Sequence, residues 1–319
     1  YWGARDLERA LPVNPSISMT LSRCISRTTV EHLPEAAPGA EVWLADEDGE
    51  LSPAARGFAL AAQRHLEALS REMNVQGGGF RVATRNSFPS AAGIASSASG
   101  FAALATATAA ALGVSPSSSE LSRWARLSGS GSAARSVMGG YVEWPGVAED
   151  PESPARQVGT PDHWTLCDVV AIVDDGPKGV SSRDGHRRAP SSPYFDRRQE
   201  LLADRLETVR AAIAARDLDR LGHAIEAEAI DLHLIAMSST PPIHYWRPGT
   251  LAVMSRMRAL RDDGVAVWAT MDAGPNVHLI CAPDDEETVA EAMAALPEVG
   301  SVIRDRVGGD PTTVGEHLF

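Results

Sequence analysis

The most constraining feature of the sequence is a run of small residues, Pro89-Ser-Ala-Ala-Gly-Ile-Ala-Ser-Ser-Ala-Ser99, which connects a predicted strand to a predicted helix. Small residues let the backbone curl tightly around an anion, and the following helix offers free N–H groups and the positive end of its dipole. The run matches neither G-x-x-x-x-G-K-[ST] nor G-x-G-x-x-G. Spacing alone therefore leaves two interpretations open: a nucleotide-phosphate loop, or a helix start that only packs closely.

Hydrophobic spacing predicts helices and strands in both halves of the chain. The predicted helices are Ser52–Met73, Ala95–Leu112, Ser118–Leu127, Arg197–Arg216, Asp217–Ala236, Pro248–Asp262 and Asp284–Ala295. The predicted strands are Glu41–Leu44, Phe80–Thr84, Tyr141–Trp144, Leu166–Val173, Val265–Met271, Val277–Ala282 and Ser301–Arg306, and Ser16–Ser22 is expected to form a hairpin with Arg27–His32. This order of elements is typical of an α+β fold with two layered lobes.

The composition shifts within residues 176–192, a segment rich in Gly, Ser and Arg. We expect the domain boundary there, with an N-terminal domain of residues 1–177 and a C-terminal domain of residues 178–319. The first would carry the small-residue run, and the second most of the long helices.

The charge of the chain restricts its partners. With 29 basic and 42 acidic residues, the net charge is −13, and an acidic surface repels phosphate backbones, which argues against nucleic acid. No stretch approaches the roughly 20 apolar residues of a membrane span, so we expect no membrane partner. Three isolated cysteines, Cys24, Cys167 and Cys281, have no CxxC spacing and favour a reducing cytoplasm.

Two polar motifs could carry chemistry, although each also has an ordinary structural explanation. Asp272 precedes a tight Ala-Gly-Pro-Asn turn between two predicted strands, where an Asp often accepts hydrogen bonds from turn N–H groups. Arg135 lies in Ser130-Gly-Ser-Ala-Ala-Arg-Ser136, and a lone Arg usually forms a surface or interdomain salt bridge. A guanidinium can also hold a carboxylate through two parallel hydrogen bonds.

The small-residue run resembles the phosphate loop of the GHMP kinase superfamily, and Asn86 to Leu104 as a whole resembles mevalonate diphosphate decarboxylases. Further blocks agree with that family in the same order: Tyr1-Trp-Gly-Ala-Arg-Asp6, Ser130–Ser136 with Gly139-Gly140, Val180-Ser-Ser-Arg183, and Met271-Asp-Ala-Gly-Pro-Asn276. Together these blocks are highly specific and cover nearly the whole chain. The resemblance implies a two-lobed GHMP-kinase-like fold, with a ribosomal-protein-S5-like N-terminal lobe and a ferredoxin-like C-terminal lobe that carries Asp272.

The resemblance also implies an activity, the ATP-dependent decarboxylation of a 5-phosphorylated mevalonate in isoprenoid biosynthesis. ATP would be a consumed co-substrate. It would phosphorylate the 3-hydroxyl, which leaves as phosphate while the developing cationic carbon draws electrons from the carboxylate. Two rival functions remain: a kinase of the same superfamily that stops after phosphorylation, and a non-catalytic regulator that binds small phosphorylated ligands. Release of CO₂ together with ADP distinguishes the decarboxylase from both.

Residue roles follow from the same resemblance. The expected catalytic residues are Asp272, which orients and deprotonates the tertiary hydroxyl, and Arg135, which holds the substrate carboxylate. The residues expected to bind substrate are Tyr1, Ser130, Gly131, Ser132, Arg135, Ser182 and Arg183. Those expected to bind ATP are Asn86, Gly93, Ala95, Ser96, Ser97 and Ser99. Mg²⁺ is expected on the ATP phosphates, with Ser97 or Ser99 as its protein ligand rather than a cage of side chains, and relatives imply a homodimer.

One departure from the family pattern concerns substrate choice. Relatives usually have a lysine after Tyr-Trp-Gly, where this chain has Ala4. Loss of a charge-assisted contact weakens phosphate binding by roughly 1.5–3 kcal/mol, and a monophosphate needs less neutralisation than a diphosphate. Ala4 therefore predicts mevalonate 5-phosphate as substrate and isopentenyl phosphate as product. The family at large favours the alternative, mevalonate 5-diphosphate giving isopentenyl diphosphate, with Arg5, Arg187 or Arg188 as compensating cations.

Overall fold

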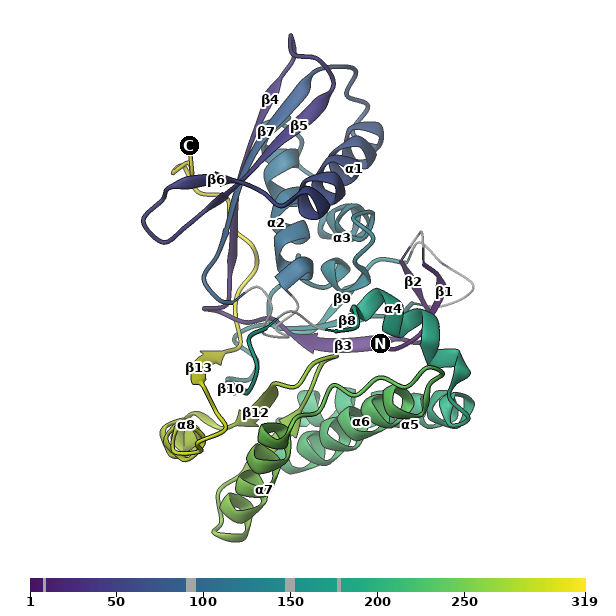
Figure 1. Cartoon of the computed structure of the whole chain (residues 1–319), viewed down its shortest axis with the longest axis vertical. Coiled ribbons are helices and arrows are strands. Elements are labelled where there is room, and N and C mark those ends of the chain that lie inside the picture. The colour runs from purple at the N-terminus through teal and green to yellow at the C-terminus, as the bar shows by residue number, and fades with distance from the viewer. Residues whose placement is uncertain (8–9, 90–95, 147–152, 177–178) are drawn as a thin grey trace.

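Figure 1 shows two lobes in the computed structural model, which describes residues 1–7, 10–89, 96–146, 153–176 and 179–319. In the N-terminal lobe the described helices are α1 (Arg56–Glu72), α2 (Ser96–Ala111), α3 (Ser118–Arg126) and the 3₁₀ turn η1 (Gly131–Ala134). The described strands are β1 (Ala4–Asp6), β2 (Leu11–Pro12), β3 (Ser16–Met19), β4 (Ser26–Leu33), β5 (Gly39–Ala45), β6 (Leu51–Pro53), β7 (Gly79–Asn86), β8 (Tyr141–Trp144) and β9 (Arg156–Gly159).

The second lobe is built around four strands and two long helices. Its strands are β10 (Cys167–Ile172), β11 (Val267–Thr270), β12 (Val277–Cys281) and β13 (Ser301–Arg306). Its helical segments are α4 (Ser182–Arg188), η2 (Ala189–Ser191), α5 (Phe195–Ala215), α6 (Leu218–Ser238), α7 (Pro248–Asp262), η3 (Pro283–Asp285) and α8 (Glu286–Ala294). The α+β class predicted from the sequence is therefore confirmed.

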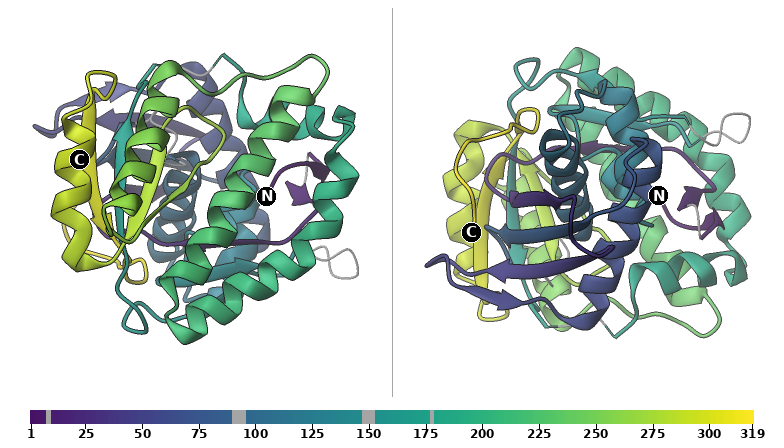
Figure 2. Two further views of the ribbon diagram at one scale, coloured as in Figure 1. Left: turned by 90° about the horizontal axis from the view of Figure 1, so that it is seen from below. Right: turned by 90° about the horizontal axis from the view of Figure 1, so that it is seen from above.

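The main sheet of the N-terminal lobe has the strand order β4-β7-β5-β6, with β5 and β7 parallel and the other neighbours antiparallel. Helices α1 and α2 cover one face of it, so that sheet and helices form adjacent layers in the right-hand view of Figure 2. In α1 the buried residues Ala62, His65, Leu66 and Leu69 recur at helical spacing. The hydrophobic periodicity that predicted this helix therefore also indicates which of its faces packs into the core.

The predicted hairpin near the N-terminus is wrong. β3 pairs with β8, while β4 pairs with β7, so the two segments belong to different sheets. The chain between them is held from the other lobe, because the Asp305 carboxylate on β13 accepts hydrogen bonds from the backbone N–H groups of Ser22, Arg23 and Cys24 at 2.7–3.0 Å. Alternation identified the extended segments but carried no information about such distant partners.

The sheet of the C-terminal lobe has the antiparallel order β11-β12-β10-β13. One face is apolar and packs on α7 and α8 through residues such as Val169, Leu279 and Val267. Side chains alternate between the faces of a strand, so Asp168 and His278 lie on the opposite face. That face looks toward the N-terminal lobe, while α5 and α6 run side by side in the left-hand view of Figure 2.

The pairing of β10 bears on the domain boundary. This strand precedes the expected boundary at residues 177 and 178, but its sheet neighbours β12 and β13 both follow that boundary. The division into domains stays a proposal, and the sheet favours placing it before Cys167. None of the described helices combines the length and the apolar character needed to cross a membrane.

Candidate active site

A cavity of about 1330 Å³ is lined by residues of both lobes. Five of the residues singled out in the sequence lie on its wall: Tyr1, Ser99, Ser132, Arg135 and Asp272. These residues come from segments far apart in the chain, and the fold brings them to one space. A cavity of this size can enclose two small substrates at once.

Asp272 lies where β11 has ended and the turn toward β12 begins. The turn itself is fastened by other side chains: Asn276 Oδ1 accepts hydrogen bonds from the N–H groups of Val173 and Asp174 at 2.7 and 3.0 Å, and the Thr250 hydroxyl donates to the Pro275 carbonyl at 2.6 Å. Residues 273–277 are buried, whereas Asp272 is exposed. The carboxylate makes no hydrogen bond to the described turn N–H groups, so it faces the cavity rather than closing the turn.

Arg135 follows η1 and is held by two serines of β3. Its Nε donates to the Ser18 hydroxyl at 3.0 Å and its Nη1 donates to the Ser16 hydroxyl. Burial lowers the pKa of Arg135, and the neighbouring Tyr1 and Asp272 oppose that effect. Among the described residues Arg135 has no carboxylate partner. A buried cation whose hydrogen-bond partners are neutral hydroxyls is costly, so its position on the cavity wall suits an anionic group of a ligand.

Ser16 and Ser18 were missed as site residues. Both line the cavity, as do Ile17 and Met19, and alternate residues of β3 point to the same side, so both serines reach Arg135. The alternating serines of the Ser16–Met19 strand are the only sign of this role in the sequence, and a sequence does not tell which face of a strand meets a ligand.

The predicted phosphate end of the substrate site lies around Tyr1 and the loop before Arg135. A Cβ on residue 131 would lie 2.5 Å from the Tyr1 phenol oxygen, so this close approach requires Gly131. The Tyr1 ring stacks on His186 with 4.5 Å between ring centroids. Arg183 donates to the Leu7 carbonyl at 3.2 Å. Its Nη1 lies beside Gly129, 3.8 Å from where a Cβ would stand if that residue had a side chain.

The remaining substrate residues are placed differently. Ser130, Gly131, Ser182 and Arg183 do not line the cavity, although Gly131 contacts Tyr1, which does. Ser182 and Arg183 are exposed on α4. The structure thus brings together Tyr1, Ser132 and Arg135, with α4 at the edge of the same region.

The predicted ATP residues surround the start of α2. Gly93 and Ala95 lie outside the described residues. Asn86 ends β7 and accepts a hydrogen bond from the Ser26 hydroxyl at 2.6 Å. Ser96 begins α2, and Ser99 lies on the cavity wall. A 16-residue helix therefore begins close to the space that Asp272 and Arg135 share.

Ser97 is exposed. Within the described ranges no cluster of three or more His, Cys, Asp or Glu side chains could hold a metal ion. Serine hydroxyls at the start of α2 are hard oxygen donors of the kind Mg²⁺ accepts, and Mg²⁺ usually takes few protein ligands beside substrate phosphates. The residues present therefore fit a magnesium ion that arrives with a nucleotide.

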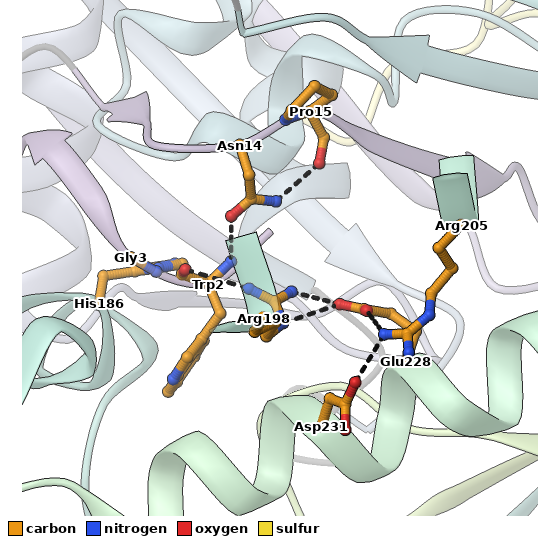
Figure 3. A network of polar contacts seen from close by, with 9 residues as sticks. All are labelled: Trp2, Gly3, Asn14, Pro15, His186, Arg198, Arg205, Glu228 and Asp231. Atoms are coloured by element: carbon orange, nitrogen blue, oxygen red, sulfur yellow. Dashed lines mark hydrogen bonds and ion pairs between the residues drawn. The ribbon is translucent and has the colours of Figure 1, made fainter. Parts of the chain in front are cut away.

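A buried ion-pair network holds the N-terminal segment against α5 and α6 (Figure 3). Arg198 is only 3% exposed, and its guanidinium donates to Glu228 and to the Trp2 carbonyl. Arg205 bonds both Glu228 and Asp231, the latter at 2.8 Å. Glu228 also lines the cavity, so the network connects the helices with the segment that carries Tyr1. The sequence did not predict this network, because its charged residues look like ordinary solvent-facing positions of amphipathic helices.

Family models match both halves of the chain. The N-terminal domain described as diphosphomevalonate decarboxylase-like matches residues 1–155. The C-terminal domain of mevalonate 5-diphosphate decarboxylase matches residues 168–312. The gap between the two matches, residues 156–167, lies before residues 176–192, the segment in which we expected a boundary on the basis of composition.

Individual relatives agree with these models. The diphosphomevalonate decarboxylase of Saccharomyces cerevisiae is 35% identical over 306 residues, which cover 90% of this chain and 75% of the yeast protein. The crystal structure of mevalonate diphosphate decarboxylase from Staphylococcus aureus matches with a TM-score of 0.88 and 29% identity, covering 97% of this chain and 92% of that one. The structure of MDDEF in complex with MVAPP, AMPPCP and magnesium matches with a TM-score of 0.87 and 33% identity, covering 97% and 93%. These matches confirm the expected two-lobed α+β fold, and the chain belongs to the diphosphomevalonate decarboxylase family of carboxy-lyases.

Proposed function

We propose that the chain catalyses the ATP-dependent decarboxylation of mevalonate 5-diphosphate, which yields isopentenyl diphosphate. The observation that carries this proposal is that Asp272, Arg135 and Ser99 line one cavity in a chain of this family. A hydroxyl-activating carboxylate, a carboxylate-binding cation and the start of a phosphate-binding helix then share one enclosed space. These are the groups that phosphorylation and decarboxylation of one substrate require.

The chemistry assigned to each group follows from its surroundings. Asp272 aligns the tertiary hydroxyl and takes its proton as the γ-phosphoryl group of ATP arrives. The carbon–oxygen bond to the new phosphate then breaks, and the electron pair of the carboxyl C–C bond forms the alkene as CO₂ leaves. Arg135, fixed by Ser16 and Ser18, holds the carboxylate in line with the breaking bond.

The comparisons favour the diphosphate over the monophosphate that Ala4 predicted. The yeast relative is named a diphosphomevalonate decarboxylase, and the similar MDDEF structure contains MVAPP. Arg183 can supply the charge that a lysine at position 4 would bring, because it has no carboxylate partner among the described residues and lies against the Gly129 loop. Arg187 is less suited, since Asp184 already neutralises it at 2.5 Å.

ATP and Mg²⁺ are proposed as co-substrate and its metal. Asn86, Gly93, Ala95, Ser96, Ser97 and Ser99 form the proposed nucleotide site, which is supported by the position of Ser99 on the cavity wall. Mg²⁺ supplies positive charge to the transferred phosphoryl group when bound, and Ser97 or Ser99 is its proposed protein ligand. A homodimer is also proposed, on the family resemblance, and sedimentation velocity at several concentrations tests it.

One assay separates the candidate functions. Purified protein is given ATP, Mg²⁺ and either mevalonate 5-diphosphate or mevalonate 5-phosphate, and CO₂ and ADP are followed together. We expect equal amounts of CO₂ and ADP, with the higher kcat/KM for the diphosphate. ADP without CO₂ would identify a kinase, binding without turnover would indicate a regulator, and a higher kcat/KM for the monophosphate would restore the substrate that Ala4 predicted.

A further inference from the structure

A histidine–carboxylate pair lies on the cavity wall outside the predicted site. His278 of β12 and Asp168 of β10 both line the cavity, and His278 Nδ1 donates to Asp168 Oδ2 at 2.8 Å. Strand alternation explains the placement: Val277 and Leu279 point into the apolar core against α7 and α8, so His278 points to the other side. The pair is therefore built into the rigid sheet, only a few residues beyond the Asp272 turn.

Asp168 needs a cation beside it. The residue is 3% exposed, its Oδ1 has no hydrogen-bond partner among the described residues, and His278 is its one described ion-pair partner. A buried carboxylate without a counter-charge is expensive, so the pair favours the protonated imidazole. Burial would lower the pKa of His278, but the charge and hydrogen bond of Asp168, with a contribution from Asp272, raise it to about 9.

The other groups around the His278 ring leave its pairing with Asp168 in place. In the sheet Thr270 of β11 and Val170 of β10 pair with His278, and neither side chain titrates. The other charged or titratable side chains that line the cavity include Asp272, Glu228 of α6, Arg135, Arg27, Asp310, Glu316 and His317. Arg27 is paired with Glu316, and the Asp310 carboxylate accepts a hydrogen bond from the Gly139 N–H. Glu228 is already bonded to Arg198 and Arg205. While Nδ1 is bonded to Asp168, Nε2 of His278 makes no hydrogen bond to the described residues, and the side chain is 13% exposed.

We propose that His278, fixed by Asp168, donates a hydrogen bond from Nε2 to an oxygen of the phosphoryl group as that group passes from ATP to the tertiary hydroxyl beside Asp272. The inference rests on the proposed function, because it names a further catalytic contact of the same reaction. Donors already fixed at the place where charge develops stabilise a transition state without reorganisation.

The bond between the γ-phosphorus and its bridging oxygen breaks with the electron pair staying on ADP, the bond to the substrate oxygen forms, and the hydroxyl proton passes to Asp272. His278 gives up no proton. Its hydrogen bond follows the phosphoryl oxygen through the transfer and stabilises the phosphate that later leaves with the electron pair of the carbon–oxygen bond.

Two variants at this position separate charge from packing. In His278→Gln a neutral side chain of similar reach remains, and we expect kcat to fall about 10²-fold with KM for mevalonate 5-diphosphate within a factor of about three. In His278→Lys the positive charge remains, and kcat should recover to within about tenfold of wild type. His244→Gln, at an exposed histidine, is the matched control and should keep the wild-type rate.

Decarboxylation by the wild type establishes the proposed function independently of these variants. If the wild type is active and the Gln variant retains its kcat, the assigned contact is overturned while the function stands. Equal loss in the Gln and Lys variants, with unchanged melting temperatures, would also overturn it, because a role through charge predicts recovery with Lys.

Asp168→Asn provides a second, independent readout. Without the carboxylate the effect of burial is no longer offset, so the imidazole should lose its proton at much lower pH, and the alkaline limb of kcat should move from near pH 9 to below the ordinary histidine pKa of about 6.5. The variant should then be much less active than wild type at pH 8 and should approach the wild-type rate only as the pH falls below about 6.5. An alkaline limb at the same pH in both proteins would contradict the proposal.

Discussion

His233 Nε2 lies 3.1 Å from the backbone carbonyl oxygen of Asp272. The ring sits on α6, is 1% exposed, and packs near Tyr245 and Trp246 with centroid separations of 5.9 and 5.5 Å. Burial lowers the pKa of His233 to about 4, so the ring is neutral at pH 7 and Nε2 carries the donated hydrogen. The carbonyl also accepts a hydrogen bond from the Gly274 N–H at 2.8 Å. A long helix thereby holds the main chain of the proposed catalytic residue.

His233→Ala should lower activity without touching the substrate. Removing the ring leaves the Asp272 carbonyl without one donor and opens space beside the turn, and small displacements of a catalytic group cost up to about 10²-fold. We expect kcat to fall roughly 10- to 10²-fold while KM for mevalonate 5-diphosphate changes little. Steady-state kinetics with matched melting curves check this. An unchanged kcat would show that the turn is fixed by Asn276 and Thr250 alone.

Asp272→Asn keeps the shape of the side chain and removes its charge. If the carboxylate aligns and deprotonates the hydroxyl, kcat should fall by about 10²–10⁴-fold with little change in substrate affinity. Direct titration of mevalonate 5-diphosphate onto the variant measures the affinity separately. A folded variant with nearly normal kcat would remove Asp272 from the mechanism.

The sequence predicted best where the signal was local. The helix at Pro248–Asp262 and the strands at Tyr141–Trp144 and Ser301–Arg306 have the predicted bounds. In each of them the signal, a helical periodicity or a run of β-branched and aromatic residues, lies within the segment itself. The short helix α4 was missed, because Ser182–Arg188 lies in a Gly- and Arg-rich segment without an apolar stripe.

Residues of the site were predictable only where a motif carried them. Asp272 and Arg135 stand in recognisable blocks and line the same cavity. Asp168, His233 and His278 lie outside these motifs. Each contacts a partner more than 35 residues away in the chain: His278 bonds Asp168 on the neighbouring strand, and His233 bonds the Asp272 carbonyl. Spacing rules for isolated histidines cannot reveal a partner that only the folded sheet supplies.

Arg135→Lys keeps a positive charge but loses the planar fork. The guanidinium now uses two of its nitrogens to bond Ser16 and Ser18, and an ammonium cannot satisfy both serines and a carboxylate with the same geometry. We expect kcat/KM to fall by about 10²-fold or more. Arg197→Lys, at an exposed arginine of α5, is the control and should keep the wild-type kcat/KM. Wild-type decarboxylation by the Arg135 variant would mean that the substrate carboxylate is held elsewhere.

Arg183→Gln tests whether this arginine compensates for Ala4. A charge-assisted contact with a phosphate contributes roughly 1.5–3 kcal/mol, so kcat/KM for mevalonate 5-diphosphate should fall about 10- to 10²-fold. The loss should be smaller for mevalonate 5-phosphate, which presents less charge. Adding Ala4→Lys to the variant should restore part of the activity. Equal losses for both substrates would show that Arg183 does not bind the second phosphate.

His65 predicts how stability depends on pH. The ring is 0% exposed, bonds the Trp124 carbonyl at 2.9 Å, and burial lowers its pKa to about 4. An unfolded histidine titrates near 6.5, so between pH 6.5 and 4 the unfolded chain binds a proton that the folded chain does not. The contribution of His65 is therefore fully present above pH 6.5 and is lost as the pH falls. From pH 7 to pH 5 the free energy of unfolding should drop by about 2 kcal/mol on this account.

His65→Leu removes that titration. Urea unfolding at pH 7 and pH 5 should show a smaller loss of stability in the variant than in the wild type, by about 2 kcal/mol, even though the variant is less stable at pH 7 for lack of a donor to Trp124. His244→Gln should keep the wild-type dependence, since its histidine is exposed. If wild type and His65→Leu lose the same stability between the two pH values, then His65 is protonated in the folded state at pH 5, and the buried ring must have a partner for its second nitrogen.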